Sequence, residues 1–190
     1  MNYSDLSAYT HEQLSEYTHE QISEGILEVN LITDRSLLDV VRWRELRDKG
    51  WSSMSDVERQ EWLGEITTTP AATKGMYTHN DLNRVERAVN FISSRLRDAG
   101  YKVPVLVTKT DWVYTDQITD DDMVRYFKNV EILRSFLKTF AGTPAAPTTK
   151  YKFNYEKAND VEKILTNVNK AVVNLTKSWC YAGEFISGEV

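Results

Sequence analysis

The 190-residue chain contains one cysteine, Cys180, and no run of about 18 apolar residues. A single cysteine excludes an intrachain disulfide framework and a zinc site built from cysteines. Without a long apolar run the sequence predicts no transmembrane helix. No basic region followed by an apolar stretch opens the chain, so we also expect no secretory signal.

The sequence also lacks the short motifs that usually carry catalysis. It has no Gly-rich phosphate loop, no H-E-x-x-H, no G-x-S-x-G and no cysteine with an evident histidine partner. Asp120, Asp121 and Asp122 could hold a hard cation, but consecutive helical residues point in different directions, so we interpret them as acids at the start of a helix. We therefore predict no catalytic residues, no metal site and no cofactor.

Basic residues are missing from the first 33 residues, which carry six acids and therefore a net charge of −6. The rest of the chain, with 23 basic and 22 acidic residues, is nearly neutral. Nucleic-acid binding needs a basic face that displaces counterions from phosphates, and neither part offers one. We expect no nucleic-acid partner and no membrane partner.

What the chain does contain is typical of a folded globular protein: 41% of its residues are hydrophobic and 11% are aromatic. The acidic segment holds a short repeat, in which YTHEQLSE at residues 9–16 is followed at once by YTHEQISE at residues 17–24. Each copy contains Thr-x-x-Gln, a capping-box arrangement that predicts one short helical turn. Because eight residues advance about 800° around a helix, successive copies turn away from one another, which favours a bent string of turns over one straight rod.

Such a unit buries too little surface to be stable alone, so we expect it to pack on the main domain, on a copy of itself or on another protein. Two interpretations remain open: a docked arm without a separate role, and an attachment arm. In the second, the partner-binding residues are the large apolar side chains of the two copies, Tyr9, Leu14, Tyr17 and Ile22. His11 and His19 have no further ligands at metal-binding spacing, so repeat copying explains the pair.

The clearest helix in the sequence covers residues 78–100. Its apolar residues are spaced 3-4-3-4-3, which predicts one narrow apolar seam: Leu82, Val85, Val89, Ile92, Leu96 and Ala99. Thr78 is a good N-cap, and Gly100 supplies the left-handed residue that commonly follows a helix.

Two further long helices repeat this spacing. One opens at Thr119 and has the seam Met123, Tyr126, Val130, Leu133, Leu137 and Phe140. The other covers residues 156–179 and has the seam Ala158, Val161, Leu165, Val168, Val172, Leu175 and Trp179. Loops that contain proline separate the helices, so the sequence predicts an all-α fold with an antiparallel three-helix bundle as its core.

Shorter elements surround this core. One helix is predicted from Thr33 or Asp34 to Gly50, with the apolar side Leu37, Val40, Val41 and Leu46, and Ser55 opens another. We expect Trp43, Trp51 and Trp62 to be core or groove residues of this helical pair. Arg84, Arg87 and Arg95 lie off the central seam, and we interpret them as solvated charges.

The remaining stretches are predicted to lack helix. Residues 101–107 contain Pro104 and predict an edge strand or an extended connection, and residues 180–190 predict an extended tail. The expected organisation is an acidic N-terminal repeat arm, residues 1–33, followed by a helical bundle domain with a C-terminal tail, residues 34–190.

Several ordered blocks resemble a recurrent family of structural or tail-associated proteins from phages and prophages of Gram-positive bacteria. They are KGMYTHNDLNRVERAVNFISSRLRDAGY, KTDWVYTDQITDDDMVRYFKNVEILR, FNYEKANDVEKILTNVNK and WCYAGEFISGEV. The resemblance covers roughly residues 32–190, and the YTHEQL repeat is similar to the short aromatic-Thr repeats that often precede this domain. It implies a virion component of the tail tip, baseplate or fibre region, and it carries over no catalytic residues.

We therefore hypothesise a non-enzymatic phage virion structural or assembly protein. It would be assembled in the host cytoplasm, attach through its N-terminal arm, and have other virion proteins and copies of itself as partners. The alternative is a small host-directed phage enzyme or effector that acts on cell-wall glycan or regulates host or phage factors. Glu184 and Glu189 would be the paired carboxylates of such an enzyme, although they fall on the predicted tail and not in a cleft.

Overall fold

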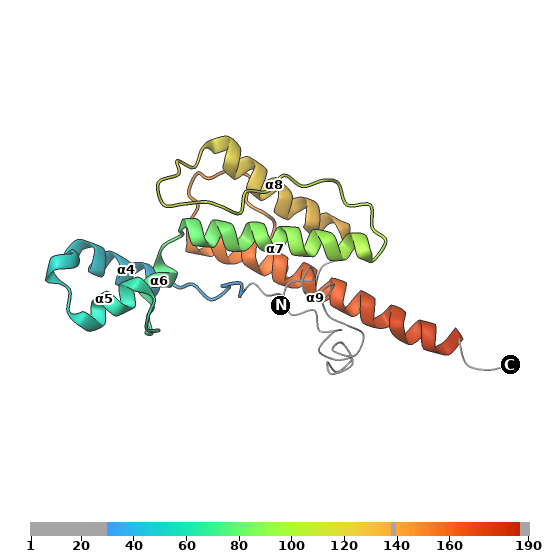
Figure 1. Ribbon diagram of the computed structural model, residues 1–190, viewed down its shortest axis with the longest axis horizontal. Helices are drawn as coiled ribbons and strands as arrows, with labels where there is room; N and C mark the ends of the chain where they lie inside the picture. Colours follow the sequence, from blue (N-terminus) through green and yellow to red (C-terminus); the bar gives the residue numbers. More distant parts are fainter. Residues whose placement is uncertain (1–29, 138–139, 187–190) are drawn as a thin grey trace, which may run out of the picture.

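The computed structural model describes residues 30–137 and 140–186, and every regular element in these ranges is a helix. The predicted all-α class is therefore confirmed for this part of the chain. The elements are α4 (Leu37–Lys49), the 3-10 helix η1 (Trp51–Ser53), α5 (Asp56–Leu63), α6 (Ala72–Gly75), α7 (His79–Asp98), α8 (Asp120–Phe136) and α9 (Tyr155–Ile186). Figure 1 shows α4, α5 and α6 gathered at one end of the molecule and the three long helices beside one another.

The long helices α7, α8 and α9 pack around one hydrophobic core. The predicted seam of α7 is buried along its whole length, and so are Met123, Tyr126, Val130 and Leu133 of α8. From α9 the core receives Val161, Ile164, Leu165, Val168 and Val172. The 3-4 spacing thus identified the buried face of α7, of α8 as far as Leu133 and of α9 from Ala158 to Val172.

Helix α7 has the ends that the sequence predicts. The Thr78 hydroxyl accepts a hydrogen bond from the Asn80 amide at 3.2 Å, and the Asp81 carboxylate accepts one from the Thr78 amide at 2.7 Å. Gly100 follows the helix with φ +81°, a left-handed conformation that glycine adopts without steric cost.

Helix α8 begins at its predicted cap but ends earlier than predicted. Thr119 and Asp122 form a capping box, whereas Leu137 is already extended and Phe140 is 45% exposed. The predicted helix is therefore too long, and the seam is wrong at Phe140, whereas Leu137 still packs against the main core. Here the Arg134 side chain donates a hydrogen bond to the Pro144 carbonyl at 2.7 Å, so the proline-containing loop folds back against the last turn.

Helix α9 is longer than predicted. It continues to Ile186, so residues 180–186, which we expected in an extended tail, are helical; residues 187–190 lie outside the described part. This stretch contains no proline, and Gly183 costs a helix interior only about 1 kcal/mol, which is too little to stop an established helix. Figure 1 shows the C-terminal part of α9 projecting beyond α7 and α8.

The small unit formed by α4, η1, α5 and α6 has its own core of Leu46, Met54 and Ala72, with Trp43 and Trp62 packed against it. Helix α4 starts after Ser36 and not at Thr33 or Asp34. Its predicted apolar side is right at Leu46, which is fully buried, and wrong at Leu37 and Val41, which are exposed; Val40 is half-buried, and Leu38 is exposed as well. Trp51 is also exposed, contrary to expectation, and stacks under the Arg59 guanidinium.

Polar contacts explain why α4 is turned this way. The Asp39 carboxylate accepts hydrogen bonds from the Ala71 amide at 2.7 Å and from the Ser36 amide at 2.8 Å. Gly75 of α6 packs so closely on α4 that a Cβ atom built there would lie 2.1 Å from the Asp39 carbonyl oxygen. The face of α4 that carries Asp39, Trp43 and Leu46 is thus covered by α6, and Leu37 and Val41 are left outside.

The connection between α7 and α8 is extended and contains no strand. Its ends are fixed by Val103 and Trp112, which are buried in the main core. The Asn83 side chain binds the Trp112 backbone on both sides, accepting from its amide at 2.8 Å and donating to its carbonyl at 2.9 Å. Within residues 30–137 and 140–186, no helix is long and apolar enough to cross a lipid bilayer.

Candidate functional site

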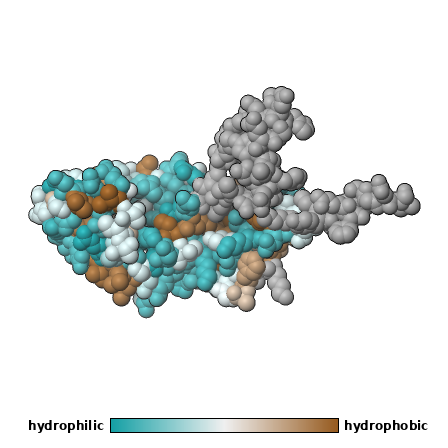
Figure 2. Space-filling model, turned by 90° about the horizontal axis from the view of Figure 1, so that it is seen from below, coloured by the Kyte–Doolittle hydropathy of each residue, from teal (hydrophilic) through white to brown (hydrophobic). Residues whose placement is uncertain are grey.

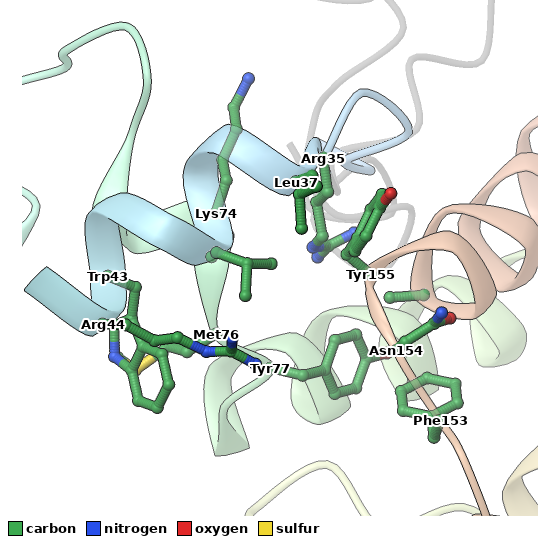
Figure 3. Close-up of a pocket in the computed structure, with 13 residues that line it drawn as sticks. Arg35, Leu37, Trp43, Arg44, Lys74, Met76, Tyr77, Phe153, Asn154 and Tyr155 are labelled. Carbon is green, nitrogen blue, oxygen red and sulfur yellow. The ribbon is translucent and has the colours of Figure 1, made fainter.

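A pocket of about 510 Å³ lies where the small helical unit meets the start of α9 (Figure 3). Helix α4 supplies Leu37, Val40, Trp43 and Arg44, and α6 supplies Lys74 and Gly75. The other lining residues are Arg35, Met76, Tyr77, Phe153, Asn154, Tyr155 and Ala158. Its volume is in the range of about 300–1,000 Å³ that is usual for ligand pockets.

Arg35 forms the charged floor of the pocket and is 4% exposed. One of its terminal nitrogens lies 2.9 Å from Asp81 Oδ1 on α7 and 2.7 Å from Glu162 Oε1 on α9. Its guanidinium carbon lies 5.3 Å from the centre of the Tyr77 ring. Arg35, two residues before α4, is therefore held by α7, by α9 and by an aromatic ring.

Arg84 of α7 completes this cluster. Its terminal nitrogen lies 2.8 Å from Glu162 Oε1, and it also contacts Asp81. Burial lowers the pKa of Arg84, but the hydrogen bonds and charges of Glu162 and Asp81 outweigh burial and raise the pKa, so the guanidinium stays charged. We expected a solvated arginine here, and for Arg84 that expectation is wrong.

The cluster is electrically balanced, with two arginines facing two carboxylates. Further hydrogen bonds come from the N-terminal segment: the Ile32 amide donates to Glu162 Oε2, and Asn159 binds both the amide and the carbonyl of Arg35. Sequence reasoning missed this cluster because Arg35, Asp81 and Glu162 belong to three separate segments, and no local pattern links them. One signal in the sequence could have indicated that Glu162 is buried. It directly follows Val161, a residue of the predicted apolar seam of α9.

Aromatic rings form the wall next to the charged floor. Tyr77 and Phe153 meet edge to face with their centres 5.1 Å apart, and the Tyr77 hydroxyl contacts the Tyr126 hydroxyl. Burial raises the pKa of the Tyr77 hydroxyl, and the charge of Glu162 raises it further. Burial raises the pKa of Tyr126 as well. Neither hydroxyl is therefore prepared to act as a base or a nucleophile near neutral pH.

The rim of the pocket is cationic. Lys74 Nζ lies 2.7 Å from Asp34 Oδ2, whereas in the part of the chain that the structure describes no carboxylate pairs with Arg44. In Figure 3 the Arg44 side chain runs from α4 toward Tyr77. None of the lining residues is acidic. Such a pocket suits an apolar or aromatic group that carries a negative charge nearby.

Asp120, Asp121 and Asp122, which the sequence singled out, do not line this pocket. Tyr9, Leu14, Tyr17 and Ile22 lie outside the described residues, as do His11, His19 and Glu189, and the Glu184 side chain is not described. Asp120 and Asp122 are helix-start acids, as predicted: Asp122 closes the Thr119 capping box, and Asp120 pairs with Lys150 at 2.7 Å. Across residues 30–137 and 140–186, no three His, Cys, Asp or Glu side chains are grouped so that they could hold a metal ion.

Comparison with known proteins gives no match to a protein-family model, to a curated protein or to a solved structure.

Proposed function

We propose that this chain is a non-enzymatic structural protein of a phage virion, associated with the tail tip, baseplate or fibre. In this proposal the three long helices form an antiparallel bundle that is the body of the protein. The acidic repeat arm attaches the body to a neighbouring virion protein or to another copy. The resemblance of the sequence blocks to phage structural proteins supports the phage assignment.

The chemistry of the pocket supports binding and not catalysis, and this observation carries the non-enzymatic part of the proposal. The Asp81 and Glu162 carboxylates are both neutralised by arginines, so neither is free to act as a general acid or base. The Tyr77 and Tyr126 hydroxyls have raised pKa values. What remains for a ligand is a set of rings, apolar side chains and rim cations, which are the components of a contact surface.

Exposed apolar side chains support an assembly role. On α4, Leu37, Leu38 and Val41 are exposed next to the pocket, and on the connection before α8 the most exposed are Val105 and Tyr114. Figure 2 shows apolar side chains at the end of the molecule that holds α4–α6 in Figure 1. Apolar groups gathered on a surface commonly mark sites where another protein binds.

Labelling of intact particles tests the proposal. Antibodies against the purified chain, detected with gold in the electron microscope, are expected to mark the tail end of particles from a phage that encodes it. Label on the head or neck would overturn the tail placement and leave the structural role. Absence of the chain from purified particles by mass spectrometry would overturn the structural role and favour a host-directed effector.

Deletion of the arm is a second test of the proposal, and the structure determines where the deletion should end. Leu31 packs against the main core and the Ile32 amide binds Glu162, so a deletion of residues 1–33 removes contacts of the folded body. Deletion of residues 1–29 spares both contacts. We expect the shorter deletion to keep the helical circular dichroism of the full chain and to be missing from particles. Incorporation of the shorter deletion at the level of the full chain would show that the arm is not the anchor.

A further inference from the structure

We infer that the pocket between α4 and the start of α9 is the docking site for the acidic repeat of the same chain. This inference rests on the proposed attachment role of the arm. It names the surface of the body on which the arm lies before the arm binds a partner. Three observations support it: where the arm leaves the body, what side chains line the pocket, and how the charges of the two are distributed.

The arm leaves the body beside the pocket. Leu31 packs on the main core, the Ile32 amide binds Glu162, and Arg35 already lines the pocket. The second copy of the repeat ends at residue 24, only eleven residues before Arg35. Eleven extended residues span about 36–40 Å, so the repeat can reach the pocket of its own chain. A tether this short gives a local concentration on the order of millimolar, which favours the chain's own arm over that of another copy.

The side chains of the repeat match those of the pocket. Each copy presents a tyrosine, a Leu or Ile five residues later, and glutamates between and after them. An inserted tyrosine ring would meet Tyr77 and Phe153, which already pack edge to face with each other. The Leu or Ile would cover Leu37 and Val40, of which Leu37 is 58% exposed.

The charges are complementary as well. The arm carries six acids and no base, whereas the pocket lining carries Arg35, Arg44 and Lys74 and no acid. Arg35 is neutralised from below by Asp81 and Glu162, so the rim cations are the ones that face an incoming carboxylate. Of these three pocket cations, Arg44 is the one that has no ion pair within residues 30–137 and 140–186, and a repeat glutamate would provide one.

Photocrosslinking of the full chain tests this placement, with p-benzoylphenylalanine introduced at Leu37. The matched control is the same substitution at Leu63, which is also a leucine of the small unit, is 59% exposed and does not line the pocket. The first basic residue of the chain is Arg35, so trypsin releases residues 1–35 as one peptide that mass spectrometry identifies. We expect several-fold more crosslinking to residues 9–24 of this peptide, located by fragmentation in the mass spectrometer, from position 37 than from position 63. Equal yields from the two positions would overturn the proposal.

Mixing chains labelled with nitrogen-15 and unlabelled chains before irradiation identifies whose arm is docked. Crosslinks within one isotope are expected, and frequent mixed crosslinks would assign the pocket to the arm of a second copy and overturn the same-chain proposal. Because either repeat copy can occupy the pocket, Tyr9→Ala alone should reduce the yield little, and the Tyr9→Ala, Tyr17→Ala pair should reduce it strongly. A double variant that still crosslinks like the parent would contradict tyrosine insertion.

Charge reversal at the rim provides an independent readout. Arg44→Glu is expected to lower the yield at position 37 by about two- to fivefold at low salt, the size expected for an exposed ion pair. Arg44→Lys should keep the yield, and the thermal unfolding temperature of both variants should match the parent. The two proposals can fail separately. Docking without arm-dependent incorporation would overturn the attachment role, and arm-dependent incorporation with equal crosslinking at positions 37 and 63 would overturn the docking site alone.

Discussion

Arg35 and Glu162 form a buried ion pair with 2.7 Å between a guanidinium nitrogen and Glu162 Oε1, and both side chains are almost completely shielded from solvent. The pair joins the segment before α4 to the interior of α9. Attraction between buried charges is strong, but it only offsets the cost of removing them from water when the remaining hydrogen bonds are made. Here Asp81, Arg84 and the amide and carbonyl of Ile32 supply most of those bonds, while Arg35 Nε has no partner among the described residues, so the four charges stabilise the junction only as a complete set.

Removing one carboxylate from this set should therefore be costly. Glu162→Gln leaves Arg35 and Arg84 facing only Asp81, and we expect it to lower the free energy of unfolding by about 3–5 kcal/mol. Urea unfolding followed by circular dichroism measures this change. The matched control is Glu131→Gln, whose exposed pair with Arg134 should contribute less than about 1 kcal/mol. A loss at Glu162 no larger than that at Glu131 would mean that the buried set does not stabilise the fold.

Close packing between α4 and α6 gives a second prediction. A Cβ atom at Gly75 would lie 2.1 Å from the Asp39 carbonyl oxygen and 2.8 Å from Trp43 Cβ, and neither atom can move without moving α4. We expect Gly75→Ala to separate the two helices and to lower the free energy of unfolding of the small unit by about 1–3 kcal/mol. Hydrogen exchange should show the loss in α4 and α6 and spare α7. Thr73→Ala, an exposed neighbour in the same helix, should change stability by less than about 0.5 kcal/mol.

Local features of this fold could be predicted from the sequence. The starts of α5 and α7 were predictable, because a cap such as Ser55 with Glu58, or Thr78 with Asp81, acts over four residues that the sequence displays together. The start of α4, which Ser36 and Asp39 cap in the same way, was missed. The seam of α7 was also predictable, because a 3-4 spacing over twenty residues leaves one apolar face to bury.

What could not be predicted depends on contacts between distant segments. Helix α4 buries Asp39 and exposes Leu37 because the Ala71 amide, 32 residues away, needs an acceptor. The pocket floor likewise depends on Glu162, which stands beside the α9 seam but is fully buried. No pattern in a single sequence shows that a distant backbone amide or arginine will bind a particular carboxylate. In the sequence, Asp39 and Glu162 therefore look like ordinary residues of a polar helix face.

Acid should weaken the small unit. Burial raises the pKa of Asp39, but hydrogen bonds from Ala71 and Ser36 outweigh it and lower the pKa below 3.8; hydrogen bonds from Arg42 lower the pKa of Glu61 below 4.5 despite burial. Because both carboxyls bind protons more weakly when folded, unfolding takes up protons in this range. Their contribution is complete above about pH 4.5 and is lost as pH falls below it through the folded pKa values.

Urea unfolding monitored at pH 7, 4.5 and 3 by tryptophan fluorescence, to which Trp43 and Trp62 of the small unit and Trp112 of the main core contribute, measures this loss. Asp39→Asn should be less stable than the parent at pH 7, by about 1–2 kcal/mol, and should lose less stability on acidification. Glu86 acts in the opposite direction, because burial raises its pKa, so the difference between parent and variant is the informative quantity. The same loss in parent and variant would show that Asp39 does not carry the acid sensitivity.

The contact between the Tyr77 and Tyr126 hydroxyls gives a prediction in which two changes cost less than one. Both hydroxyls are buried and bind each other, so removing one leaves the other without a partner. We expect Tyr77→Phe or Tyr126→Phe alone to lower the free energy of unfolding by about 1–3 kcal/mol, because an unsatisfied buried hydroxyl keeps its full desolvation cost. The double variant removes both polar groups and retains both rings, so it should be more stable than either single variant. Additive losses in this cycle would mean that each hydroxyl has another partner, and the aromatic wall of the pocket would then be a polar network and not a single shared hydrogen bond.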